Sequence, residues 1–233
     1  MSDESLRCGL SLMSLRALLF DLDGTLVDSD AVHIEAFRAI SAVHGVSFDD
    51  DFFVQHMSGH SNAEICRALF PDMSVSEHER IADEKEALFR SMIDGAVLAI
   101  PGVVATVDWA LAKGLALGVV SNAPRENVQA VLRSLGLLGR FDVEICGGSV
   151  PRGKPDPMPY SAALDRLALA ADQAVAFEDT ALGIRAAVGA GIATVGLTTT
   201  QPAEALTAAG AALAIGNYED KRLESFLAKR LIQ

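Results

Sequence analysis

Short apolar runs alternate with stretches of helical periodicity along most of this chain. Continuous apolar runs of this length are typical of parallel strands that are buried on both faces. The strand candidates are residues 16–20, 115–120, 141–146, 174–177, 192–197 and 211–215. Helices are predicted over residues 103–113, 124–136 and 182–188, and again after Tyr218. This alternation predicts an α/β fold with a doubly wound, Rossmann-like parallel sheet.

Residues 29–95 break the alternation because they show helical periodicity alone. Helices are predicted over residues 30–43, 63–70 and 76–93, and Ser61 with Glu64 forms a capping box at the start of the second one. We therefore expect a Rossmann-like core of residues 15–28 and 96–233, with an inserted all-helical cap of residues 29–95. Residues 1–14 carry acidic residues where a secretory signal has basic ones, and we expect them to be a disordered lead-in.

The charge balance limits the partners of the protein. Half of the 233 residues are hydrophobic, and the formal net charge is -12 with only 19 Lys and Arg residues. A polyanion needs a basic face, so neither nucleic acid nor an anionic membrane surface is an expected partner. The sequence has no apolar run of the roughly 18 residues that a membrane span needs. Its three cysteines lack metal-ligand spacing and indicate reduced thiols. We expect a cytoplasmic monomer or weak homo-oligomer.

Polar residues follow four of the predicted strands at their carboxyl ends. Ligands of an open parallel sheet gather at this edge. The residues concerned are Asp21 with Asp23, Ser121 with Asn122, Lys154, and Glu178 with Asp179. The spacing of Asp21 and Asp23 places both carboxylates on one side of an extended chain, and Gly24 then allows a sharp turn. Two like charges so close favour a shared cation or proton.

Each of these features has a plain structural interpretation when it is taken alone. The Asp-x-Asp pair could be a surface turn or a structural calcium loop, and the Ser-Asn pair a helix cap. Gly-Lys-Pro is a common loop, and the acidic pair could be a solvated strand end. Their common placement at strand ends favours a functional site. Carboxylates without His or Cys suit Mg²⁺, which keeps water and phosphate oxygens as its other ligands.

Two residues of the helical segment are open to more than one interpretation. Lys85 lies inside the apolar stripe of its helix, so its ammonium either reaches water or meets an anion. The pattern alone favours a lysine that snorkels to water. His33 lies one turn before Phe37, and it is either a catalyst or a residue packed at the boundary of its helix; the pattern alone favours the packed residue.

Four segments together resemble the haloacid dehalogenase superfamily of aspartyl phosphotransferases. They are residues 20–25 (Phe-Asp-Leu-Asp-Gly-Thr), 119–122, 153–157 and 177–187. The similarity is to the group of β-phosphoglucomutase and of small sugar-phosphate or phosphoglycolate phosphatases, and it extends from Leu15 to about Leu197. It implies Mg²⁺ as cofactor, a small phosphorylated metabolite as partner, and a helical cap that closes over the substrate.

The resemblance implies a covalent mechanism. Asp21 would attack phosphorus, and Asp23 would protonate the leaving oxygen and later deprotonate the attacking water. Mg²⁺ would bind the Asp21 carboxylate, the Asp23 backbone carbonyl and Asp179, with Glu178 bound directly or through water. Lys154, Ser121 and the amides near Asn122 would hold phosphate oxygens. The resemblance further implies substrate contacts for Gly24, Thr25, His33, Asn62 and Lys85.

Two positions depart from β-phosphoglucomutase. Asn62 stands where the mutase has an arginine that grips a second phosphate, and Thr25 stands where it has valine. The loss of a bidentate phosphate clamp weakens the case for a bisphosphate intermediate. Hydrolysis of a small phosphorylated metabolite is therefore the expected activity, with a phosphomutase as the alternative. A dehalogenase is less expected because its chemistry needs no Mg²⁺, and a non-catalytic phosphate-binding protein is a remote alternative.

Overall fold

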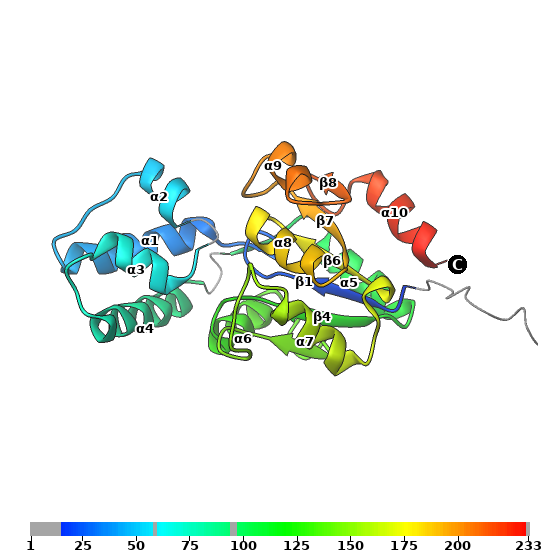
Figure 1. Ribbon diagram of the computed structural model, residues 1–233, viewed down its shortest axis with the longest axis horizontal. Coiled ribbons are helices and arrows are strands. Elements are labelled where there is room, and N and C mark those ends of the chain that lie inside the picture. The colour runs from blue at the N-terminus through cyan, green and yellow to red at the C-terminus, as the bar shows by residue number, and fades with distance from the viewer. Residues whose placement is uncertain (1–14, 58–59, 94–96, 232–233) are drawn as a thin grey trace, which may run out of the picture.

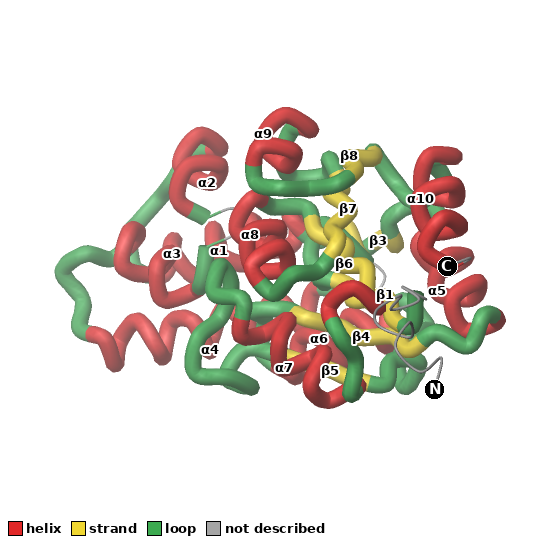
Figure 2. The backbone as a smooth tube through the Cα atoms, turned by 45° about the vertical axis from the view of Figure 1, so that its right-hand side comes forward, coloured by secondary structure: helices red, strands yellow, loops and turns green. Residues whose placement is uncertain are grey.

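The computed structural model describes residues 15–57, 60–93 and 97–231, and its centre is an open sheet (Figures 1 and 2). The sheet has six parallel strands in the order β5-β4-β1-β6-β7-β8. Their bounds are β1 (Ala17–Phe20), β4 (Ala116–Val120), β5 (Val143–Ile145), β6 (Ala174–Glu178), β7 (Ala193–Leu197) and β8 (Leu213–Ile215). The predicted doubly wound α/β fold is confirmed.

Helices cover both faces of this sheet, as the alternation of side chains along β1 requires. Leu18 and Phe20 point to one face, where they share a buried cluster with α5 (Val103–Ala112), α6 (Arg125–Ser134) and α10 (Lys221–Leu231). Ala17 and Leu19 point to the other face and share a second cluster with α7 (Met158–Leu167) and α8 (Ala181–Gly189). The helix α9 (Ala203–Ala208) lies against β7, β8 and α8.

Four further helices gather at one end of the molecule, apart from the sheet (Figure 1). They are α1 (Asp30–Val43), α2 (Asp50–His56), α3 (Asn62–Leu69) and α4 (Val75–Met92). They enclose a hydrophobic cluster of their own, which includes Phe37, Ile65, Cys66 and Ile81. The capping box of Ser61 and Glu64 is present, and Ser74 with Glu77 forms a second one at the start of α4.

A short antiparallel ribbon lies where the chain passes between these two groups of elements. It consists of β2 (Val27–Asp28) and β3 (Leu98–Ala99), which the sequence pattern did not predict because two-residue strands carry no periodicity. The division of the chain at residues 29 and 95 stays a prediction, and residue 95 lies outside the described residues, as does the predicted lead-in of residues 1–14.

The pattern located the other elements to within a few residues, with two kinds of difference. The third and sixth predicted strands are shorter than expected, at β5 and β8, and the helices α2, α7 and α9 were not predicted. Among the helices that the structure describes, none combines the length and apolar character needed to cross a membrane.

Candidate active site

The polar residues predicted at the strand ends meet at the carboxyl edge of four neighbouring strands. Asp21 and Asp23 follow β1, Ser121 follows β4, Lys154 lies after β5, and Glu178 ends β6. After β1 the chain runs outward through β4 and β5 and then crosses back to β6 on the other side of β1. This reversal is the point where open α/β sheets bind their ligands.

Lys154 is the cation at the centre of the group. Its Nζ donates to Asp21 Oδ1 at 2.6 Å and to Glu178 Oε1 at 2.5 Å. Burial alone would lower the pKa of Lys154, but the charges of Asp21 and Glu178 raise it above its ordinary value. Lys154 is therefore a fixed positive charge that holds carboxylates from two strands.

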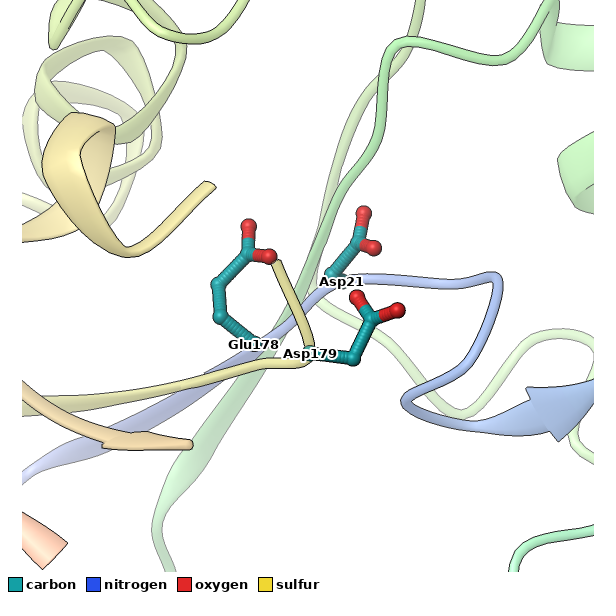
Figure 3. Close-up of side chains that lie close together, drawn as sticks. All are labelled: Asp21, Glu178 and Asp179. Atoms are coloured by element: carbon teal, nitrogen blue, oxygen red, sulfur yellow. The ribbon is translucent and has the colours of Figure 1, made fainter. Parts of the chain in front are cut away.

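Asp21, Glu178 and Asp179 form a carboxylate cluster, with one oxygen of each lying within 4.8 Å of the others. Figure 3 shows the three side chains rising from the ends of β1 and β6. Burial raises the pKa of Asp21 to about 7, with Lys154 acting in the opposite direction and Glu178 adding to the rise. Burial, Asp21 and Glu178 raise the pKa of Asp179 well above its ordinary value. Ionisation of both Asp21 and Asp179 at neutral pH is therefore unfavourable without a further cation.

The local structure around Glu178 fits a metal ion. Its Oε2 is buried and has no hydrogen-bond partner among the described residues, while Oε1 accepts from Lys154 and from the hydroxyl of Tyr160 at 2.7 Å. A Cβ at Gly183 would lie 1.9 Å from Oε2, so only glycine leaves room for this oxygen. A buried carboxylate oxygen without a donor is costly unless a cation binds it. An all-oxygen donor set of this kind suits Mg²⁺.

The turn after Asp23 brings two predicted residues to the same cluster. Gly24 has φ +69°, and a Cβ there would lie 2.2 Å from Asp179 Oδ2. The hydroxyl of Thr25 donates to Asp179 Oδ1 at 3.5 Å. Both residues therefore shape the surroundings of Asp179, and the substrate contacts that the resemblance implies for them stay predictions.

Ser121 and Asn122 lie at the end of β4 and line the same pocket as the carboxylates. The hydroxyl oxygen of Ser121 accepts from the backbone N–H of Ala123 at 3.0 Å, so its own proton remains available for a phosphate oxygen. The side-chain amide of Asn122 accepts from Lys154 N at 3.0 Å and donates to Lys154 O at 3.3 Å. Asn122 thus positions the loop that carries the central lysine.

Asp23 faces the helical segment rather than Lys154. Its Oδ1 accepts from the hydroxyl of Ser29 at 2.5 Å and lies 3.1 Å from His33 Nε2. Burial would raise the pKa of Asp23, but His33 and Ser29 outweigh this and lower it. His33 is stacked on Phe89 with ring centroids 3.9 Å apart, so it packs at a boundary, as predicted, and also touches Asp23.

The prediction that Lys85 snorkels to water is wrong. Lys85 is only 2% exposed, and its Nζ lies 2.8 Å from His33 Nδ1 and 2.9 Å from Glu86 Oε1. A lysine ammonium has no acceptor capacity, so Lys85 donates to Nδ1 and His33 carries its proton on Nε2 toward Asp23. A continuous hydrogen-bonded chain therefore joins α4 to the end of β1.

Three residues of the site were not predicted. Tyr160 is fully buried in α7 and orients Glu178, Glu86 is buried in α4, and Asn127 in α6 is bonded to Glu86. Tyr160 and Asn127 are buried although other polar residues of their helices are exposed, and helical periodicity alone does not distinguish a buried polar residue from an exposed one. Glu86 adjoins Lys85, and its position beside a lysine inside an apolar stripe was the signal that could have revealed it.

One pocket lies between the sheet edge and the helical group. Its lining combines the strand-end residues Asp21, Ser121 and Lys154 with Asn62, Lys85 and Glu86 from α3 and α4. The carboxylate cluster and the buried lysine thus lie at the carboxyl edge of an open parallel sheet and face a polar cavity. This arrangement is that of an α/β phosphotransfer enzyme.

Comparison with known proteins places the chain more narrowly. The sequence profile of the haloacid dehalogenase-like hydrolase family matches residues 18–197, and the chain belongs to this family. Validoxylamine A 7'-phosphate phosphatase of Streptomyces hygroscopicus subsp. limoneus is 35% identical over 214 residues, which cover 83% of this chain and 91% of that protein. Phosphorylated carbohydrates phosphatase of Thermotoga maritima is 29% identical over 183 residues, covering 76% and 82%.

A solved structure shows the same likeness in three dimensions. CbbY from Rhodobacter sphaeroides in complex with phosphate has a TM-score of 0.79 and 28% identity, and the match covers 88% of this chain and 96% of that one. The predicted membership of the superfamily is therefore confirmed, and the similar proteins include named phosphatases.

Proposed function

We propose that this protein is a phosphatase that hydrolyses the phosphate monoester of a small metabolite through an aspartyl phosphate on Asp21. The observation that carries the proposal is the position of the Asp21 carboxylate. It lies 2.6 Å from Lys154 Nζ and beside Glu178 and Asp179, in the pocket at the sheet edge. The similar proteins are named as phosphatases of validoxylamine A 7'-phosphate and of phosphorylated carbohydrates, and these names support a phosphatase rather than a mutase.

The reaction has two steps, transfer of the phosphoryl group to Asp21 and hydrolysis of the aspartyl phosphate. A free oxygen of Asp21 attacks phosphorus, the bond to the ester oxygen breaks, and the phosphoryl group is transferred to the carboxylate. Lys154 and the hydroxyl of Ser121 stabilise the charge that develops on the phosphoryl oxygens. Water then attacks the same phosphorus, which releases inorganic phosphate and restores Asp21.

Asp21, Glu178 and Asp179 are the residues that would hold Mg²⁺ in this proposal. The ion supplies the positive charge that lets the buried carboxylates and a phosphate dianion occupy one site together. The buried Oε2 of Glu178 and the glycine at position 183 support direct binding by Glu178.

Asp23 is the proposed general acid and base. It must deliver a proton to the leaving oxygen and later accept one from water. Its lowered pKa favours the ionised form that activates water, and the chain through His33 to Lys85 holds it in place.

Residues 29–95 are proposed to act as the cap. They supply one wall of the pocket, and closure over the substrate excludes water that is not positioned for attack. The second candidate, a phosphomutase, would transfer the phosphoryl group to a sugar hydroxyl, which requires a grip on a second phosphate. Asn62, an uncharged residue on the cap side, favours hydrolysis.

The test is a phosphate-release screen over phosphorylated metabolites with the wild-type protein and with Asp21→Asn. We expect Mg²⁺-dependent release that EDTA stops, and a loss of at least about 1,000-fold in Asp21→Asn, as for removal of other covalent nucleophiles. A parallel assay for glucose 6-phosphate formed from β-glucose 1-phosphate distinguishes a mutase. Phosphate release by Asp21→Asn at the wild-type rate would contradict the proposal.

A further inference from the structure

Glu86 places a negative charge in the wall of the pocket that faces the reactive carboxylate. It is 6% exposed and lines the pocket from α4, opposite Asp21 and Lys154. Glu86 Oε1 accepts from Lys85 Nζ at 2.9 Å and from Asn62 Nδ2 at 2.5 Å. These hydrogen bonds compensate the cost of burying a carboxylate, so Glu86 is a stable part of the pocket wall.

The core of the protein fixes the second oxygen of the same carboxylate. Asn127 in α6, which is completely buried, donates from Nδ2 to Glu86 Oε2. The other end of the Asn127 amide accepts from Arg90 Nη1 at 2.7 Å, which sets the orientation of the amide. Glu86 is therefore held from both the helical group and the sheet domain, and it cannot swing away from a ligand without breaking these bonds.

Glu86 is ionised at neutral pH. Burial would raise its pKa, but the charge of Lys85 and the hydrogen bond from Asn62 lower it below its ordinary value. The negative charge of Glu86 thus balances the positive charge of Lys85, and Asn62 is uncharged. Among the described residues that line the pocket, Lys85 and Lys154 are the only lysines or arginines, so this wall offers no unpaired lysine or arginine to a second anionic group.

A carboxylate accepts about four hydrogen bonds, and Glu86 already receives three. By this count Oε2 has capacity for one more hydrogen bond, and because Glu86 lines the pocket, a substrate hydroxyl or amine there is a suitable donor. A second phosphate or a carboxylate on the substrate would instead bring two negative charges together in a buried site, which is strongly unfavourable. This wall of the pocket therefore favours substrate groups that donate hydrogen bonds and disfavours anionic substrate groups.

We propose that Glu86 is a specificity-determining residue that selects monophosphates with a hydroxyl-rich leaving group and no second anion. Bisphosphates and phosphorylated carboxylic acids are excluded by the same residue. The inference rests on the proposed phosphatase function and narrows its substrate class. It assigns the selection among substrates to the wall formed by α3 and α4, away from the proposed metal ligands.

The experiment compares kcat/KM for four esters with Mg²⁺ present. Glucose 6-phosphate and mannitol 1-phosphate represent hydroxyl-rich monophosphates, and fructose 1,6-bisphosphate and phosphoglycolate carry a second anion. For the wild-type protein we expect the better of the first two to exceed both of the others by at least 100-fold. Glu86→Gln removes the charge and keeps the shape, and we expect it to reduce these ratios at least 10-fold.

Two further variants make the test specific. Glu84→Gln removes a carboxylate from the exposed face of the same helix, where it pairs with Arg80, and we expect it to leave the ratios within 2-fold of wild type. Asn62→Arg adds a cation beside Glu86 and is expected to raise the relative value for fructose 1,6-bisphosphate at least 10-fold. If Glu86→Gln does not fold, the result for Asn62→Arg alone tests whether the charge of this wall selects the substrate.

The inference is overturned if the wild-type protein prefers phosphoglycolate or the bisphosphate, or if the folded variants at positions 62 and 86 leave the ratios unchanged. Hydrolysis of p-nitrophenyl phosphate is measured beside the four esters. Mg²⁺-dependent release from this ester without the expected ratios counts against Glu86 alone. Absence of release from all five esters contradicts the proposed function itself, and the inference falls with it.

Discussion

Asp21→Asn is expected to stabilise the protein when no metal is present. The folded structure raises the pKa of Asp21 from 3.8 to about 7, so ionisation of this carboxylate opposes folding. The difference is about 3 pKa units at roughly 1.36 kcal/mol each, which gives an upper estimate of about 4 kcal/mol above pH 7. The side chain of Asp21 is 14% exposed, so solvent screening reduces this figure only in part. Asparagine has nearly the same shape and no charge.

The pH dependence follows from the sign of the shift. Because the folded state holds the proton more tightly than the unfolded state, the wild-type protein loses stability as pH rises from about 4 to about 7. Asparagine does not titrate, so the advantage of the variant is near zero at pH 4 and complete above pH 7. For a chain of this size, 1 kcal/mol corresponds to about 2–4 °C in Tm.

The assay is thermal unfolding of both proteins in EDTA at several pH values between 4 and 8, repeated with excess Mg²⁺. We expect the variant to melt several degrees higher than wild type in EDTA at pH 8. Mg²⁺ should raise the Tm of the wild-type protein and have a much smaller effect on the variant. A variant that melts at or below the wild-type temperature in EDTA at pH 8 would refute the charge argument.

Two further changes test the surroundings of Glu178. Gly183→Ala places a methyl group 1.9 Å from Glu178 Oε2 and should cost about 1–3 kcal/mol in the free energy of unfolding, measured by urea denaturation, with weaker Mg²⁺ binding. An unchanged midpoint would show that the carboxylate moves aside freely. Tyr160→Phe removes the 2.7 Å hydrogen bond to Glu178 Oε1 and should weaken Mg²⁺ binding about 10-fold or more in calorimetry. Wild-type affinity in this variant would mean that Lys154 alone orients Glu178.

The strands and the residues at their ends could be predicted because their signals are local. A short apolar run followed by Asp21, Ser121 or Glu178 is visible in the sequence, and the rule that parallel strands present their carboxyl ends at one edge brings these residues together. The capping box of Ser61 and Glu64 is local in the same way. These parts of the site needed no knowledge of how the chain packs.

The cap side of the site could not be predicted, because its contacts join distant parts of the chain. Lys85 was expected to reach water, since helical periodicity does not show that His33, 52 residues earlier, lies beside its ammonium. Glu86 is paired with Asn127 across 41 residues, and Tyr160 with Glu178 across 18. Such buried polar networks depend on tertiary packing.

The most direct test of the covalent mechanism is the stereochemical course at phosphorus. A thiophosphate ester of a sugar, made chiral with ¹⁶O and ¹⁸O, is hydrolysed in H₂¹⁷O, and the configuration of the released thiophosphate is determined. Each in-line displacement inverts phosphorus, so transfer to Asp21 followed by attack of water predicts overall retention. Inversion would mean a single attack by water on the substrate and would contradict the assignment of Asp21 as the nucleophile.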